Sequence, residues 1–231
     1  MAATAARAFA RTVALMRLFF GVPIPPTASA MLAALCARLQ TQRGWHWVAE
    51  RNWHITLAFL GETDGNDVSA LSELGENVAA EHSVCNITLA QLQWWPSLNK
   101  PRLLAAVSET PGPLAPIRKA LANGLREIGI NFDSKPLRPH VTLMRLERGT
   151  ALQYFELPSG SVDVDIESIA LYRSERMHGE THYRPLWQKD LKSNPPRSLL
   201  VRGEVFSPSP DKGRAGEGFC KTKNGADDNR K

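Results

Sequence analysis

The sequence predicts a protein of mixed helices and strands in two related halves. The pattern His, β-branched apolar residue, Thr, Leu occurs twice, first in "HITLAFLG" from His54 and again in "HVTLMRL" from His140. A separation of 86 residues between the two histidines fits two related halves better than a short-period repeat. Strand-like, helix-like and strand-like segments also follow one another in each half. Two matching motifs in a chain with only six histidines favour a paired site over a chance histidine on a half-exposed strand.

The strand and helix patterns can be followed along the chain. Apolar runs closed by turn residues predict strands, and apolar residues at helical spacing predict helices, the first with Gly44 as its expected stop. The expected strands cover residues 17–26, 54–61, 84–95, 102–108, 140–146, 162–174 and 181–188, and the expected helices cover 27–44, 67–81 and 114–128.

Length and composition indicate a soluble globular protein. The chain has 231 residues, of which 43% are hydrophobic, enough to bury a sizeable core. No apolar run approaches the roughly 20 residues that a membrane-spanning helix needs. The three cysteines, Cys36, Cys85 and Cys220, are widely spaced and odd in number. They fit reduced thiols in a cytoplasmic protein better than a disulfide framework or a zinc site.

The basic residues indicate how the chain is organised. The net charge is +5, but residues 16–193 contain equal numbers of basic and acidic side chains. Bulk charge is therefore only a weak argument for RNA binding. Residues 1–15 are rich in Ala and Arg and are interpreted as an N-terminal extension rather than a targeting segment, with translation from Met16 left open. Residues 194–231 are predicted to be a disordered basic tail, because Pro, Gly, Ser, Lys and Asp dominate there.

The two motifs predict a catalytic pair. Side chains alternate between the faces of a strand, so His54 and Thr56 share one face, as do His140 and Thr142. If the strands face each other across a cleft, one imidazole can accept a proton while the other donates one. The hydroxyls can hydrogen-bond the oxygens of a phosphodiester as charge develops on them. Phosphoryl transfer is therefore the chemistry that fits best.

Other chemistries fit these residues less well. Neither motif contains the carboxylate of a serine-type triad, and no HExxH zinc motif occurs. "HGETH" at 178–182 has helical ligand spacing, but its glycine and the following "YRPL" favour a turn into a strand. A metal-dependent hydrolase therefore remains the last alternative.

Several residues outside the motifs are not assigned to the site. Strict alternation puts Arg145 on the face opposite His140 unless the strand bulges, and Arg138 is better placed to meet a phosphate. Sheet packing is favoured over nucleotide stacking for Tyr172, Ser174 and Tyr183. Core or edge packing is favoured for Trp45, Trp47, Trp94 and Trp95.

The motif pair, with "HITLAFLGE" and "RPHVTLMR", resembles the 2H phosphoesterase superfamily, specifically the bacterial RNA 2′,3′-cyclic phosphodiesterases historically called 2′-5′ RNA ligases. The resemblance extends from about Met16 to Leu191, including the opening "RLFFGV" and the late "IALYRSERMHGETHYRPL". It implies a bilobal α+β fold over residues 16–193, with two pseudo-symmetric lobes around a central cleft. Each lobe has an antiparallel sheet and flanking helices.

The resemblance also implies a reaction. His54 is the acid that protonates the departing ribose 3′ oxygen, His140 is the base that activates water, and Thr56 and Thr142 hold the phosphate. The expected substrates are RNA ends or nucleotides with a 2′,3′-cyclic phosphate, and the expected product is a 2′-phosphomonoester. No metal or cofactor and no membrane is implied, and we expect a monomer in the cytoplasm. Ligation of RNA through 2′-5′ linkages and a noncatalytic RNA- or protein-binding module remain alternatives.

Overall fold

The computed structural model describes residues 14–39, 42–150, 156–177 and 179–193. These ranges belong to one unit of the chain, Met1–Asn194. Residues 1–13 of the predicted extension and the whole predicted tail, 194–231, lie outside the described residues. The first strand begins at Leu15, one residue before the predicted domain boundary. No helix in the described ranges is long and apolar enough to cross a bilayer.

The order of the elements follows the predicted pattern of strands and helices. In chain order they are β1 (Leu15–Pro23), α1 (Pro26–Cys36), β2 (Trp45–Trp47), β3 (His54–Asp64), α2 (Val68–Glu81), β4 (Cys85–Leu89), β5 (Gln91–Trp95), β6 (Leu103–Val107), α3 (Leu114–Glu127), β7 (His140–Leu146), β8 (Val162–Ile166), β9 (Ser168–Met177) and β10 (Glu180–Asp190). Each predicted strand and helix is confirmed in type. The short strand β2 was not predicted, and α1 ends at Cys36, well before the expected stop at Gly44.

Most strands join one antiparallel sheet. Its order is β10-β9-β1-β3-β7-β6-β5, and β2 pairs with β7 beside this path. The sheet consists of two four-stranded sets, because β3 and β7 are joined only at Ile55 and Val141. A separate antiparallel pair, β4 and β8, forms a second sheet. The sheets give the fold its α+β class.

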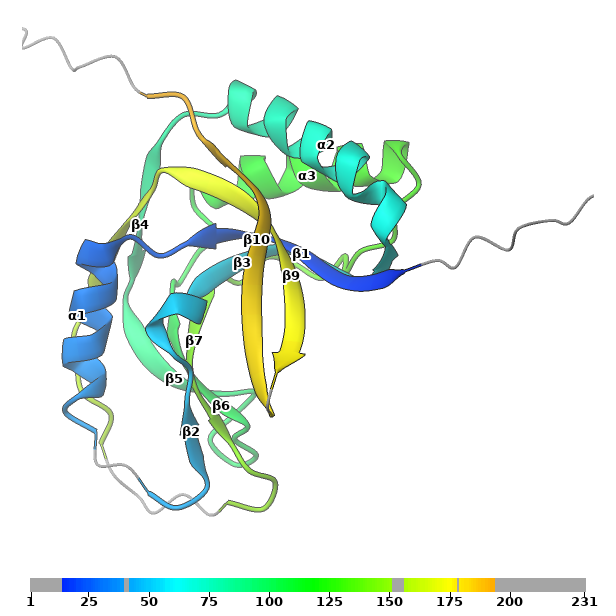
Figure 1. The fold of residues 1–231 in the computed structure, drawn as a ribbon. Coiled ribbons are helices and arrows are strands. Elements are labelled where there is room, and N and C mark those ends of the chain that lie inside the picture. The colour runs from blue at the N-terminus through cyan, green and yellow to red at the C-terminus, as the bar shows by residue number, and fades with distance from the viewer. Residues whose placement is uncertain (1–13, 40–41, 151–155, 178, 194–231) are drawn as a thin grey trace, which may run out of the picture. The chain divides into compact units, whose positions relative to one another are not determined.

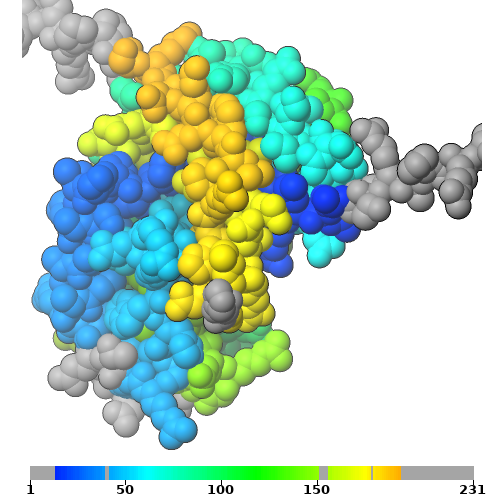
Figure 2. All heavy atoms as spheres, in the orientation of Figure 1, coloured from blue at the N-terminus to red at the C-terminus, as the bar shows by residue number. Residues whose placement is uncertain are grey.

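The helices pack against both sheets (Figure 1). Helices α2 and α3 pack against each other, α2 against β9 and β10, and α3 against β3, whereas α1 contacts β8. Gly75 allows the close approach of α2 to β10, because a Cβ atom there would clash with the ring of Trp187. In the space-filling view the β9–β10 hairpin, in yellow and orange, crosses the middle of the visible face (Figure 2).

One apolar core connects these elements. It contains fully buried side chains from strands and from all three helices described above, including Phe20, Leu32, Leu71, Leu125 and Leu143. Burial of such side chains is the main favourable term in folding. Ile55 and Val141, which pair β3 with β7, both belong to this core. Core packing therefore stabilises the junction between the two strands.

Candidate active site

The two repeated motifs meet at the junction of the sheet. Their second residues, Ile55 and Val141, are Cα partners in the antiparallel pair of β3 and β7. Antiparallel register then puts the histidine of each motif opposite the threonine of the other. The four predicted site residues line one cavity of about 590 Å³; they are His54, Thr56, His140 and Thr142.

Both imidazoles are held in the same way. Nδ1 of His54 lies 2.7 Å from the carbonyl oxygen of Asn52, and Nδ1 of His140 lies 2.8 Å from that of Arg138. A carbonyl oxygen only accepts hydrogen bonds, so Nδ1 carries the proton in each ring. In the neutral form, Nε2 of each ring is therefore the atom with a free lone pair.

His54 sits among aromatic rings. The ring centroids of Phe19 and Tyr183 each lie 4.7 Å from that of the imidazole. Burial among them lowers the pKa of His54 from 6.5 to about 4, and the positive charges of His140 and Arg145 act in the same direction. The hydrogen bond to the backbone opposes this shift without cancelling it. In the free site His54 is thus neutral at pH 7.

His140 has a different environment. The ring centroid of Trp95 lies 4.2 Å from that of the His140 imidazole. The guanidinium of Arg138 lies over the Trp95 ring, 4.5 Å from its centroid. Burial is the main cause that lowers the pKa of His140, and the charges of Arg138 and Arg145 lower it further. Both imidazoles are therefore proton acceptors in the free protein.

A β-bulge lies at the same place in each motif. The register with the neighbouring strand skips Leu57 in β3 and Leu143 in β7, the leucine of each motif. An extra residue moves the side chains beyond it to the opposite face. Arg145 therefore lines the cavity with His140, and Phe59 lines it at the matching position of β3. Arg145 is exposed, as a surface charge would be, but the predicted placement on the face opposite His140 is wrong for this reason.

Asn52 fixes the edge of the site, and the sequence offered no signal for this role. Its side chain is 8% exposed. Nδ2 donates to the carbonyl of Thr181 at 2.8 Å, and Oδ1 accepts from the backbone N–H of Tyr183 at 3.2 Å. The same residue whose carbonyl orients His54 thus also ties β10 to the site.

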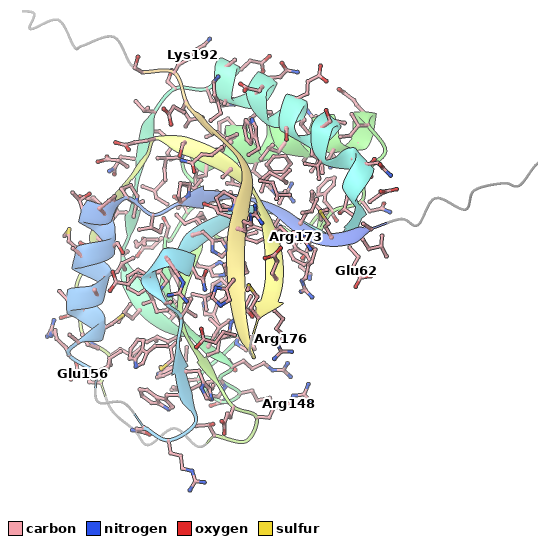
Figure 3. The ribbon with its side chains drawn as sticks, viewed as in Figure 1. Glu62, Arg148, Glu156, Arg173, Arg176 and Lys192 are labelled. Carbon is pink, nitrogen blue, oxygen red and sulfur yellow. The ribbon has the colours of Figure 1, made fainter. Side chains whose placement is uncertain are left out.

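Cationic side chains surround the cavity. Arg17, Arg145 and Arg176 line it, and the one carboxylate in its described lining, that of Glu175, lies 3.0 Å from Nε of Arg173. Arg173 and Arg176 both extend from β9, Arg176 near the end of the strand (Figure 3). The cavity therefore favours an anion.

The remaining aromatic and polar predictions divide between cavity and core. Ser174 and Tyr183 line the cavity, and Tyr172 packs under it against Phe19, with ring centroids 5.1 Å apart. Burial raises the pKa of Tyr172 to about 12, so its hydroxyl stays protonated at neutral pH. Core packing is confirmed for Trp45 and Trp94, which are 6% and 8% exposed. Trp95 was missed as a neighbour of His140, although in a strand it must face away from a buried Trp94.

Of the two histidines of "HGETH", the structure describes His182. His178 lies outside the described residues, and Nε2 of His182 lies 3.8 Å from a carboxylate oxygen of Glu180. Among the residues that the structure describes, no three His, Cys, Asp or Glu side chains are grouped as metal ligands.

The arrangement brings together the groups that an anionic substrate requires. Two Nε2 atoms can exchange protons, two hydroxyls can donate hydrogen bonds without adding charge, and the guanidinium of Arg145 can pair with a phosphate oxygen. The burial of both imidazoles makes their proton affinity sensitive to a bound charge.

Comparison with known proteins gives consistent matches. Residues 22–105 match the model of the LigT like Phosphoesterase family. The chain is 30% identical over 166 residues to an RNA 2′,3′-cyclic phosphodiesterase of Thermus thermophilus, covering 69% of this chain and 82% of that protein. It is 26% identical over 170 residues to the Escherichia coli protein of the same name, covering 74% of this chain and 93% of that protein. A Geobacillus stearothermophilus relative, 27% identical over 161 residues and 68% of this chain, is matched over about half its length, 51%.

Solved structures match as well. A crystal structure of a Thermus thermophilus protein superposes with a TM-score of 0.69 at 28% identity, covering 77% of this chain and 99% of that one. Escherichia coli LigT complexed with 3′-AMP gives a TM-score of 0.61 at 27% identity, with the same coverage of 77% and 99%.

Proposed function

Since the chain belongs to the LigT-like phosphoesterase family, we propose that it hydrolyses 2′,3′-cyclic phosphate ends of RNA to 2′-phosphomonoesters. One observation carries this proposal. Two imidazoles with the same tautomer turn their free Nε2 atoms toward one cation-lined cavity. A cyclic phosphodiester needs one proton removed from water and one delivered to the leaving oxygen, and this pair can do both.

The proposed reaction is a single displacement at phosphorus. The water oxygen forms a bond to phosphorus while the bond from phosphorus to ribose O3′ breaks. The water proton passes to Nε2 of His140, and the Nε2 proton of His54 passes to O3′. Thr56 and Thr142 donate hydrogen bonds to the non-bridging oxygens, and Arg145 balances the charge that builds on them. No metal ion takes part in these steps.

The order of roles follows the resemblance to the family, and the charges around the two motifs differ. Two residues before His140 stands Arg138, and five residues after it stands Arg145, whose charges both lower the pKa of His140. The matching positions around His54 hold Asn52 and Phe59, which carry no charge. These charges keep Nε2 of His140 unprotonated and free to accept a proton, and the negative phosphate raises the pKa of His54 so that it can hold the proton it delivers.

We also interpret the fold as two pseudo-symmetric lobes related at the Ile55–Val141 pair. The matched bulges, the matched carbonyl contacts and the equal four-stranded sets on each side of that pair support a local two-fold relationship. Such a relationship presents two equivalent imidazoles to one phosphorus atom from opposite sides, as an in-line displacement requires.

The test is turnover of an oligonucleotide that ends in a 2′,3′-cyclic phosphate, with EDTA present. The expected product is a 2′-phosphate, identified by ³¹P NMR. The variants His54→Ala and His140→Ala should not form this product at a comparable rate. A 3′-phosphate product, a requirement for added metal, or absence of turnover would contradict the proposal. Absence of turnover with retained RNA binding would favour the noncatalytic alternative. An added RNA with a 5′-hydroxyl tests 2′-5′ ligation, in which that hydroxyl replaces water.

A further inference from the structure

We infer that Arg17, Ser174 and Arg176 form a second phosphate subsite, which binds the internucleotide phosphate next to the cyclic end. This inference rests on the proposed function and narrows its substrate to RNA of at least two nucleotides. The three side chains line the same cavity as the two histidines, but they come from β1 and β9.

The register of β1 and β9 puts these side chains together. Arg17 and Ser174 are Cα partners in the antiparallel pair. Arg176 is two residues beyond Ser174 and therefore lies on the same face. By strand geometry, the Cα atoms of Arg17 and Arg176 are about 8 Å apart, so both guanidinium groups can reach one phosphate.

This group is separate from the reacting centre. On β1, Gly21 is the Cα partner of Thr56, and Arg17 lies four residues from Gly21, about 13 Å along the strand. The guanidinium of Arg17 lies 4.9 Å from the ring centroid of Phe59, whose Cα partner Phe19 is halfway between Arg17 and Gly21. The side chain of Arg17 thus reaches back toward the reacting phosphate, to the side where the next phosphate of the strand would lie. Arg145 lowers the pKa of both histidines, whereas neither Arg17 nor Arg176 contributes. A phosphate held between the imidazoles therefore leaves Arg17 and Arg176 for another anion.

The charges of the two arginines are not neutralised by the protein. No carboxylate in the described part of the chain forms an ion pair with Arg17 or Arg176. The nearby carboxylate of Glu175 is paired with Arg173 instead. Two exposed guanidinium groups beside a hydroxyl match the oxygens of a phosphodiester, which accept charge-assisted hydrogen bonds. The adjacent phosphate of an RNA strand supplies this anion, and a cyclic mononucleotide does not.

Two dinucleotides test the subsite, both ending in a 2′,3′-cyclic phosphate. One has an ordinary phosphodiester linkage, and the other has an uncharged methylphosphonate linkage of similar size. We expect kcat/KM to be about tenfold higher for the charged linkage, the effect of charge-assisted hydrogen bonds to one phosphate. In the double variant R17Q/R176Q this preference should disappear, because kcat/KM falls about tenfold more for the phosphodiester substrate than for the methylphosphonate substrate. The preference should also weaken as salt is raised.

The controls separate this inference from the proposed function. Lys119→Gln removes one charge from the exposed face of α3, outside the cavity lining, and should keep the preference. R17K/R176K keeps both charges and should retain part of the preference for the charged linkage. Circular dichroism checks that each variant is folded. Equal rates for both linkages in the unsubstituted protein, or an equal loss on both in R17Q/R176Q, overturn the subsite alone. No turnover of either dinucleotide overturns the proposed function and the subsite with it.

Discussion

In both His54 and His140, Nδ1 faces the backbone and Nε2 faces the cavity. Each Nδ1 donates to the carbonyl two residues earlier, at 2.7 and 2.8 Å. Because both Nε2 atoms are left to exchange protons, the two imidazoles can act as one catalytic unit. Their neighbours differ, however, and this difference makes the roles of the two residues distinguishable by experiment.

The first prediction concerns the pair as a unit. His54→Ala and His140→Ala should each lower kcat by about 10²-fold or more, because each removes one proton transfer. The double variant should lose far less than the product of the two effects, since a concerted site loses most of its benefit with its first member. Steady-state rates on a cyclic phosphate measure this. His46→Ala, at the exposed position of β2, is the control. Near-normal rates in a folded His54→Ala or His140→Ala variant would reject the proposed roles.

The second prediction concerns pH. The rate should fall at low pH, where both imidazoles are protonated and none can accept a proton, and at high pH, where both are neutral and none can donate one. Both imidazoles have pKa values lowered from 6.5, that of His54 to about 4. The bell-shaped profile of kcat/KM should therefore have its maximum below pH 6.5. The profile of kcat should lie at higher pH, because bound phosphate raises both pKa values. A kcat/KM maximum above pH 7 would contradict this.

The third prediction separates the two histidines. Arg138 lowers the pKa of His140 but is not among the groups that lower that of His54. Arg138→Gln should therefore raise the NMR titration midpoint of His140 and move that of His54 much less. Arg148→Gln removes an exposed charge outside the cavity lining and should move neither. Equal movement of both midpoints in Arg138→Gln would argue against the asymmetry between the motifs.

The fourth prediction concerns Asn52. Replacing it with Ala removes two hydrogen bonds to the backbone of β10, one to the carbonyl of Thr181 and one from the N–H of Tyr183. The free energy of unfolding should fall by about 1–3 kcal/mol, measured by urea denaturation. Asn86→Ala removes an exposed side-chain hydrogen bond to Asp165 and should cost less. Equal losses in the two variants would show that the contacts of Asn52 with β10 add little stability.

The acid stability of the protein depends on the same burial. His54 has a folded-state pKa of about 4 against 6.5 in the unfolded chain, so the unfolded state binds more protons between these values. The stability that the neutral imidazole allows is present above pH 6.5 and is lost progressively as the pH falls toward 4. This loss accompanies the acidic limb of the activity profile.

The sequence by itself determined the local structure of the site. The repeated His, apolar, Thr, Leu pattern identified two strands, and alternation put each histidine and threonine on one face, because side-chain direction in a strand depends only on neighbouring residues. Helical and strand periodicity likewise predicted α2, α3 and the outer strands, whose apolar faces recur at regular spacing.

Only the tertiary structure decided what surrounds the two imidazoles. A bulge at Leu143 brings Arg145 into the cavity, and whether an extra residue is accommodated depends on the partner strand. Asn52 meets Thr181, and Trp95 meets His140, across separations that no local pattern encodes. The pKa values follow from these contacts, since burial and neighbouring charge are properties of the packed chain. The motifs therefore predicted four side chains that line one cavity, and the fold decided the proton affinity of the two imidazoles and their neighbours.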